Sequence, residues 1–408
     1  MPSTLLKIRN SCLILFSFSL PISISISNFF VFAACICVLL EWTFKGNFKK
    51  ILQSKWMISM IILFILFLLG FIMSLSSENA VIVSDSSRLF RISLLLILLP
   101  ILYTATYSIQ FVKSIFWANI ISNSFSSLLA ILINYGIINH LLKFNLFAEE
   151  LNYFYFVQIN DFKNGAYLNY ADHNFFVAVS IVFSVLFFKK IKHNYRLVLV
   201  LMSGLLLFSL FTERGIVGIL ILSLFAVFYN LKLIYNNMFI TTIILLIFSS
   251  TIYLNSSVVN KVLGQNVIYK TIVFKIKQKE NIRLIFFEKT LDLAVQKPLF
   301  GYGLGTWRNE YDNYTNSNLN KHRTPHNNYL HIWMELGILG LVSMILIFYY
   351  QIIEMMNGNR FIFTVFPVIF LILMFFDNYF ISPTGLLLYT LFSLILINVH
   401  PFNSSIKS

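Results

Sequence analysis

The sequence predicts an all-α, polytopic integral membrane protein, with about twelve transmembrane helices and one large loop on the outer side of the membrane. Composition is the first observation: 58% of the 408 residues are hydrophobic and 11% are charged. A soluble protein of this length could not bury so much apolar surface. Second, apolar runs of about twenty residues, long enough to cross a bilayer as a helix, recur along most of the chain. Third, a single long polar segment, roughly residues 255–325, separates two groups of these runs.

The predicted spans follow the apolar runs in order, with the polar connections as their boundaries. They cover residues 10–26, 28–43, 56–75, 89–107, 110–136, 174–188, 197–212, 215–230, 238–255, 328–350, 361–376 and 384–399. We divide the chain into an N-terminal bundle of about nine helices at 1–254, a large periplasmic loop at 255–327 and C-terminal helices at 328–408. Together they form one membrane domain. No small-residue cleavage site follows the first run in the usual place, so we expect it to remain as a helix.

The short loops predict the orientation. Basic residues fill two of them, and the positive-inside rule places both in the cytoplasm. These residues are Lys45, Lys49, Lys50, Lys55, Lys189, Lys190, Lys192 and Arg196. With the N-terminus also inside, the long 255–325 segment falls on the outer side, as does the short connection 377–383.

The net charge of +14 has two sources. The cytoplasmic lysines account for about half of it, as expected from topology alone. The long outer loop also carries more lysine and arginine than acidic residues. That excess suits anionic ligands presented at the membrane, such as pyrophosphates. A solvated loop attracted to anionic lipid would have the same composition, so charge alone leaves both interpretations open.

His326 is the leading candidate for a catalytic residue. It follows Pro325, which can set a helix entry, and we expect it in the first turn of a transmembrane helix at the water boundary. A histidine at that place can pass a proton near neutral pH. Alternatively, it caps the helix or bonds to Asn327 and merely holds the loop.

Four arginines are candidate ligands for an anion. Arg214 sits in an outer turn so tight that it must lie near the lipid boundary, where a charge is costly unless it is paired or faces a wet cavity. Glu213 is an alternative partner for it. Arg283 opens an amphipathic stretch, and it could equally be a surface residue of a helix lying on the membrane. Arg88 and Arg91 flank the outer end of the fourth span, where snorkelling to the interface competes with pyrophosphate contact.

Other motifs point away from nucleotide and metal sites. The segment Gly301–Gly305 is glycine-rich, but no strand precedes it and no Lys-Ser/Thr follows, so we expect a turn that brings the backbone close to a ligand or a helix. His331 and Glu335 are four residues apart and can pair within a helix. The remaining histidine spacing does not suit zinc. The cysteines, all in the first apolar runs, are expected to be packed or lipid-facing thiols: Cys12, Cys35 and Cys37.

A family resemblance rests on several of these residues together. The pattern His326-Asn327, nine residues, Gly337, two residues, Gly340 resembles the signature of bacterial O-antigen ligases. Their superfamily also includes Wzy-type O-antigen polymerases and O-linked oligosaccharyltransferases. Further matches are the outer turn 211–215 and the segment 283–307. The resemblance runs from about residue 205 to 344, and Glu213 departs from it, where many relatives carry a small polar residue.

The resemblance implies a membrane glycosyltransferase of lipopolysaccharide biosynthesis that uses no nucleotide sugar. Its donor would be a glycan on undecaprenyl pyrophosphate in the bacterial inner membrane, and its acceptor the lipid A core, with the active site facing the periplasm. An acceptor hydroxyl would attack the anomeric carbon, inverting it, while the lipid pyrophosphate leaves. We expect no metal, no cofactor and no nucleic acid partner, and lipids as the surroundings.

The residues suit this chemistry directly. Guanidinium groups stabilise a departing pyrophosphate through paired hydrogen bonds, which makes Arg214 and Arg283 catalytic candidates beside His326 as the base. The predicted substrate-binding residues are Arg88, Arg91, Arg323 and Asn327.

Three alternatives stay open. A polymerase would share the chemistry, and we favour a ligase because the histidine motif matches fully. The protein-glycosylating relatives usually have longer chains with a C-terminal extension. An exporter that moves glycans without chemistry would carry charges along a transmembrane cavity, whereas the notable charges here are predicted on the outer face.

Overall fold

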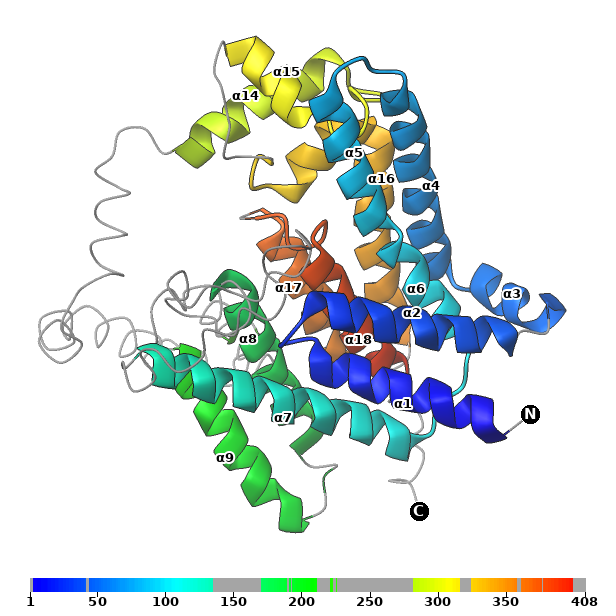
Figure 1. Cartoon of the computed structure of the whole chain (residues 1–408), viewed down its shortest axis with the longest axis vertical. Helices are drawn as coiled ribbons and strands as arrows, with labels where there is room; N and C mark the ends of the chain where they lie inside the picture. The colour runs from blue at the N-terminus through cyan, green and yellow to red at the C-terminus, as the bar shows by residue number, and fades with distance from the viewer. Residues whose placement is uncertain are drawn as a thin grey trace, which may run out of the picture. The chain divides into compact units, whose positions relative to one another are not determined.

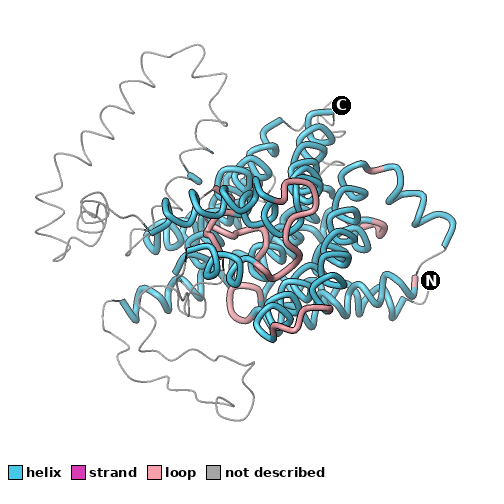
Figure 2. The backbone as a smooth tube through the Cα atoms, turned by 90° about the horizontal axis from the view of Figure 1, so that it is seen from above, coloured by secondary structure: helices cyan, strands magenta, loops and turns pink. Residues whose placement is uncertain are grey.

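The computed structural model describes residues 3–41, 44–134, 170–188, 191, 193–210, 221–222, 225, 282–315, 324–357, 361–375 and 377–398 (Figure 1). These residues form helices and the turns between them, with no strand among them (Figure 2). The predicted all-helical class is therefore confirmed. The chain divides into two compact units, one made of Met1–Ser122 with Ile282–Ser408 and the other of Asn123–Asn281.

The N-terminal half of the first unit begins with a helical hairpin, α1 packed against α2. The Ser23 hydroxyl caps α2 by accepting a hydrogen bond from the Ile26 N–H. The helices of this half are α1 (Ser3–Ser19), α2 (Ile24–Leu40), α3 (Phe44–Gln53), α4 (Lys55–Leu75), α5 (Ala80–Ser93) and α6 (Leu95–Tyr103). α7 (Ile109–Asn134) begins in the first unit and ends in the second.

The C-terminal half of the first unit is organised around one long helix, α16. It packs along α4, and α14 packs against it (Figure 1). The helices here are α14 (Ile282–Gln296), α15 (Trp307–Thr315), α16 (Asn328–Asn357), the 3₁₀ turn η3 (Phe361–Thr364), α17 (Val365–Leu373) and α18 (Pro383–Asn398). Segments far apart in the sequence thus form one helical body.

The second unit is described in part. It contains α8 (Tyr170–Phe187) and α9 (His193–Leu210), which pack against each other. In the same unit the end of α7 meets α8 through a buried bond from the Asn123 amide to the Ser180 hydroxyl, 3.0 Å long. Side-chain bonds of this kind tie membrane helices together where water is absent.

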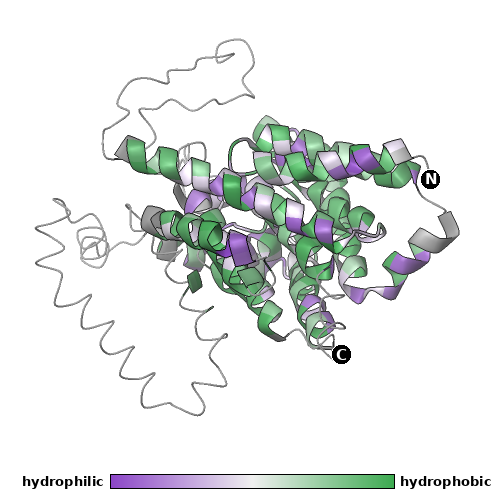
Figure 3. Ribbon diagram, turned by 90° about the horizontal axis from the view of Figure 1, so that it is seen from below, coloured by the Kyte–Doolittle hydropathy of each residue, from purple (hydrophilic) through white to green (hydrophobic). Residues whose placement is uncertain are grey.

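Four described helical segments are long and apolar enough to cross a membrane: Lys55–Leu75, Ala80–Tyr103, Ile109–Leu132 and Asn328–Met356. Shorter apolar helices cover Ile24–Leu40, His173–Phe187, His193–Leu207, Ile362–Leu373 and Pro383–Asn398. Figure 3 shows that hydrophobic residues dominate these helices. Many of their large apolar side chains are exposed, among them Leu39, Ile65 and Leu201, as expected where lipid replaces water. A helical membrane protein is confirmed; the number of twelve spans, the large outer loop and the orientation remain predictions.

Individual boundaries differ from the prediction for local reasons. The basic connection before the third predicted span forms a helix, α3, in which Ile51 is buried. Lys50 Nζ in this helix donates a hydrogen bond to the Thr104 carbonyl at 3.2 Å. The fourth predicted span starts earlier, because Asn79 caps α5 by accepting from the Val81 N–H at 2.9 Å. Two other predicted spans, 215–230 and 238–255, fall almost entirely outside the described residues.

A buried polar chain fixes α4, α16 and α18 to one another. Trp56 Nε1 donates to the Tyr389 hydroxyl at 2.9 Å, which in turn donates to Gln351 Oε1 at 2.7 Å. The Gln351 amide then donates to the Ser393 hydroxyl at 3.1 Å. Satisfied polar chains of this kind define a unique packing, because leaving any one member unpaired in a buried site is costly.

Candidate active site at the start of helix α16

His326 lies just before α16 rather than in its first turn. Its backbone φ is 55°, in the left-handed region that residues other than glycine seldom adopt. The helix cap is supplied by the next residue instead, since Asn327 Oδ1 accepts from the Leu330 N–H at 3.0 Å. The capping bond that the structure shows at this end of α16 thus comes from Asn327. A strained backbone held in place by its surroundings is typical of functional sites.

The His326 side chain is paired with a carboxylate. Its Nδ1 lies 2.9 Å from Asp377 Oδ1, and the two side chains are 28% and 34% exposed. A carboxylate beside Nδ1 holds the proton on that nitrogen, so the lone pair of the neutral ring is on Nε2. This His326–Asp377 dyad can thus both orient the ring and prepare it to accept a proton.

The α16 entry holds the loop that carries Asp377. The Asn328 N–H donates to the Met374 carbonyl at 2.9 Å, and Asn328 Oδ1 accepts from the Phe380 N–H at 3.0 Å. The Asn327 amide donates to the Phe375 carbonyl at 3.2 Å. Asn327 is 3% exposed. Both the amide oxygen and the amide nitrogen of its side chain bond to backbone groups, so its contact with substrate stays a prediction.

α16 is broken at Gly337, whose φ of 70° and ψ of −171° are not helical. The break leaves carbonyl and N–H groups of α16 without helical partners. These groups form hydrogen bonds with residues 298–306, here named the glycine loop. The bonds are Tyr302 N to Met334 O at 2.9 Å, Gly303 N to Glu335 O at 2.9 Å and Ile338 N to Pro298 O at 2.8 Å. The glycine loop thus replaces the missing helical bonds. The predicted close approach of this backbone to a helix is confirmed.

The glycine loop packs closely against α4, α5 and α16, and at some of its positions there is no room for a side chain. A Cβ at Gly305, whose φ is 76°, would lie 2.2 Å from the Ser86 nitrogen of α5. On α4, the Gly70 carbonyl accepts from the Leu304 N–H at 3.4 Å, and Ser74 Oγ donates to the Leu304 carbonyl at 2.6 Å. Only glycine allows two backbones to approach this closely at Gly305.

The predicted pairing of His331 with Glu335 is confirmed. His331 Nε2 lies 3.2 Å from Glu335 Oε1, and both side chains are 2% exposed. The same carboxylate oxygen accepts from the Trp307 N–H at 3.2 Å, at the start of α15. A negative charge at a helix N-terminus is favourable, so Glu335 connects α16 to α15.

α14 and α15 are fastened to α16 by an aromatic cluster. Trp307 packs edge-on against Phe286, with ring centroids 5.6 Å apart, and Tyr311 lies 5.3 Å from both. Met334 of α16 completes the cluster. Burial raises the pKa of the Tyr311 phenol, so the phenol stays neutral within the cluster. α14, which begins with Ile282 and Arg283, is therefore packed against α16, the helix that follows His326.

The structure places the predicted arginines unevenly. Arg88 Nε lies 3.6 Å from Asp85 Oδ1 within α5, and the exposed Arg91 donates from Nε to the Ser87 carbonyl at 3.3 Å. Arg283 is on α14, with its side chain outside the description. Arg214 and Arg323 lie outside the described residues. Their contributions to the site remain predictions.

No group of three or more histidine, cysteine or acidic side chains within the described ranges could hold a metal ion. The three cysteines are free thiols, with Cys35 and Cys37 buried and Cys12 partly buried. Unlike the buried His331–Glu335 pair, the His326–Asp377 dyad is partly exposed, as acid–base chemistry on a substrate requires.

We expect Gly337→Ala to lower the melting temperature of the detergent-solubilised protein by several degrees. A Cβ there would lie 2.0 Å from the Leu299 carbonyl oxygen, and the positive φ adds strain. Gly204→Ala on α9 is the matched control, because nothing lies within 4 Å of its Cβ position and alanine favours a helix by about 1 kcal/mol. Equal melting temperatures for the two variants would contradict the described break.

Comparison with known families matches residues 197–345 to the O-antigen ligase family. The matched region contains three of the predicted arginines, His326 and the break at Gly337. It ends before Asp377, and it begins after Arg88 and Arg91. No curated protein matches the chain. The resemblance found in the histidine and glycine pattern is thereby confirmed.

Proposed function

We propose that this chain, which carries an O-antigen ligase domain at residues 197–345, transfers a glycan from undecaprenyl pyrophosphate to the sugar core of lipid A. The observation that carries the proposal is the His326–Asp377 dyad, at 2.9 Å, on a non-helical residue next to a membrane-length helix. A base at the end of such a helix is at the depth where a lipid pyrophosphate meets water.

The reaction is a single displacement. The acceptor hydroxyl oxygen forms a bond to the anomeric carbon while the bond from that carbon to the pyrophosphate oxygen breaks. The electron pair of the broken bond leaves with the lipid pyrophosphate, and the hydroxyl proton passes to Nε2 of His326. Attack opposite the leaving group inverts the anomeric centre.

Asp377 would act through the imidazole. Its carboxylate keeps the proton on Nδ1 and stabilises the positive charge that forms when Nε2 takes up the acceptor proton. It also holds the ring in one orientation, because the loop that carries it is bonded to α16 through Asn327 and Asn328. Asp377 is thus a positioning residue.

Arg214 and Arg283 would stabilise the leaving group. Negative charge gathers on the pyrophosphate as the sugar departs, and planar guanidinium groups bind phosphate oxygens in pairs. In support, the aromatic cluster ties α14, on which Arg283 lies, to α16. Arg88, Arg91 and Arg323 would hold the resting donor through the same chemistry.

Purified protein in nanodiscs, given a lipid-pyrophosphate-linked glycan and rough lipopolysaccharide, tests the proposal. We expect core-linked glycan to appear on a gel and free undecaprenyl pyrophosphate to be released in equal amounts. Products in which glycan repeats are joined on the lipid would identify a polymerase, which the same dyad could serve. Passage of intact lipid-linked glycan across the bilayer, without pyrophosphate release, would contradict any transferase function.

A further inference from the structure

Two neighbouring apolar side chains project from the tip of the glycine loop. Leu299 is 61% exposed and Phe300 is 68% exposed, although the backbone beside them packs closely on α16. They precede Gly301, whose positive φ of 69° turns the chain sharply. The sequence places both residues in the long polar connection between membrane spans, where water would surround them.

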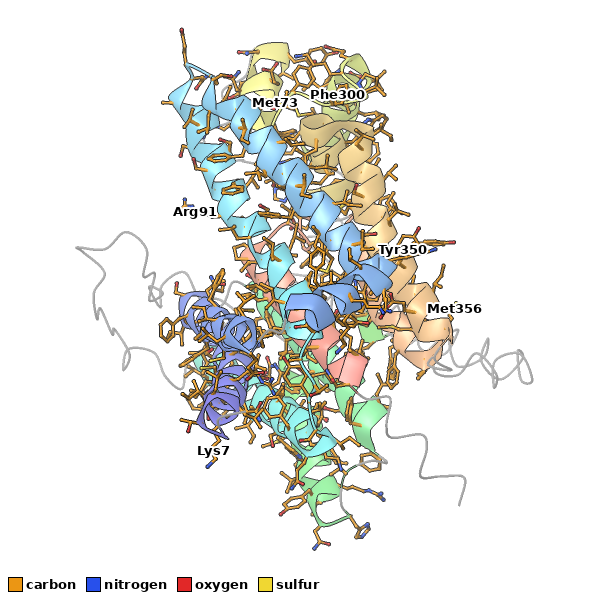
Figure 4. The ribbon with its side chains drawn as sticks, turned by 90° about the vertical axis from the view of Figure 1, so that its right-hand side faces the viewer. Lys7, Met73, Arg91, Phe300, Tyr350 and Met356 are labelled. Carbon is orange, nitrogen blue, oxygen red and sulfur yellow. The ribbon has the colours of Figure 1, made fainter. Side chains whose placement is uncertain are left out.

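The tip lies beside membrane-length helices rather than beyond their ends. Pro298 bonds to Ile338, which is inside the candidate span Asn328–Met356, and Leu304 bonds to Gly70, inside the span Lys55–Leu75. Figure 4 shows Phe300 and Met73 of α4 at the same end of the bundle formed by α4, α5 and α16. The depth of the glycine loop therefore overlaps the last turns of α4 and the upper part of α16.

The nearby faces of both spans are apolar and exposed as well. On α4 and α16, the outward side chains that would contact acyl chains are 44–57% exposed. They are Leu69, Ile72, Met73, Leu75, Leu339 and Val342. Leu299 and Phe300 thus continue a surface that two transmembrane helices already present to lipid.

The backbone of the glycine loop is adapted to a place without water. Irregular backbone at membrane depth is tolerated where its polar groups are bonded within the protein. Besides the bonds to α16 and α4, the Gly301 N–H donates to the Lys297 carbonyl at 3.0 Å, and Thr306 Oγ1 donates to the Gly303 carbonyl at 2.7 Å. The Pro298 carbonyl also accepts from Trp333 Nε1 at 3.3 Å.

A lysine and two aromatic side chains with polar atoms lie close to the tip in the sequence or through a bond to the glycine loop. The Lys297 ammonium lies 4.1 Å from the centroid of the Tyr302 ring, and the partly exposed Trp333 bonds to Pro298. Lysine, tyrosine and tryptophan are the residues that anchor proteins at the boundary between acyl chains and headgroups. The positive charge of Lys297 also complements lipid phosphates.

We propose that Leu299 and Phe300 insert into the acyl-chain region of the bilayer, with Lys297 at the headgroups, so that the glycine loop is a membrane wedge held by the break in α16. The wedge fixes the level of α14 and α15 relative to the bilayer. This role is independent of any transferase activity, because it requires only the lipid surface.

Nitroxide labels on Phe300→Cys and Asn313→Cys of the full chain in nanodiscs test the wedge. Asn313 is the matched control, an exposed residue of α15. Collisions with oxygen should dominate for the label at 300, and collisions with a water-soluble nickel chelate should dominate at 313. The label signal of the unmutated protein, with its three free thiols, is subtracted as background.

Each other outcome overturns the proposal. Equal chelate access at both positions would place the tip in water. Exclusion of oxygen and chelate alike at position 300 would mean that protein, such as a second copy of the chain, covers it. As an independent readout, we expect the added fluorescence of Phe300→Trp, relative to the unmutated protein, to be quenched by lipids brominated along the acyl chain; absence of quenching would refute insertion.

Discussion

His326→Ala is expected to slow glycan transfer by at least about a hundredfold, and by up to about ten-thousandfold, while the protein stays folded and binds the lipid-linked donor. General-base catalysis is worth that much in rate, whereas loss of a helix cap costs about 1 kcal/mol of stability. The His326 side chain is 28% exposed, and Asn327 supplies a cap of α16, so removal of the imidazole should leave no large cavity. Single-turnover rates with saturating donor, together with the melting temperature, measure the two effects separately.

Two further variants distinguish a base from a structural hydrogen bond. His326→Gln keeps a polar side chain beside Asp377 but cannot accept the proton, so it should be as slow as alanine. Asp377→Asn should also slow transfer strongly, because loss of the carboxylate frees the ring to adopt the other tautomer. His193→Gln, an exposed histidine at the start of α9, is the control and should transfer at the normal rate. A normal rate for His326→Gln would refute the base assignment.

The apolar runs predicted the helical class because composition and run length are properties of the sequence alone. Which residues come into contact in the folded chain was harder to predict. Asp377 follows His326 by 51 residues, and their contact depends on how α16, α17 and the connecting loop pack. One signal was present: the connection 377–383 was predicted on the same side of the membrane as His326, and it contains an acidic residue.

The break in α16 illustrates a second limit. The run from residue 328 to 350 is predominantly apolar, so it predicts an unbroken helix, and a glycine within a helix is tolerated at a modest cost. Gly337 leaves the helix because a second segment supplies the missing hydrogen bonds. The glycine-rich segment was predicted to form a turn that approaches a ligand or a helix. Nothing in the sequence identified α16 as that helix, or Gly337 as the residue at which the two backbones meet.

The last expectation concerns the arginines. Arg283→Lys and Arg214→Lys should each lower the transfer rate by about a hundredfold to a thousandfold, the usual cost, ~3–4 kcal/mol, of losing one oriented donor to developing charge. Lysine keeps the positive charge but not the planar fork that binds two phosphate oxygens at once. For Arg283, the aromatic cluster that joins α14, α15 and α16 should hold the helix in place after the exchange, so the loss should appear in the chemical step.

Arg196→Lys is the matched control, since Arg196 donates to the Ile191 carbonyl at 3.2 Å and belongs to a loop predicted on the cytoplasmic side. It should transfer glycan at the normal rate. The comparison also separates the two roles considered for these residues. If the basic surface only attracts anionic lipid, all three lysine variants keep full activity at equal protein levels, because net charge is unchanged. If the guanidinium groups bind the leaving pyrophosphate, raising the salt concentration will not imitate the loss, since paired hydrogen bonds in a closed site are screened far less than exposed charges.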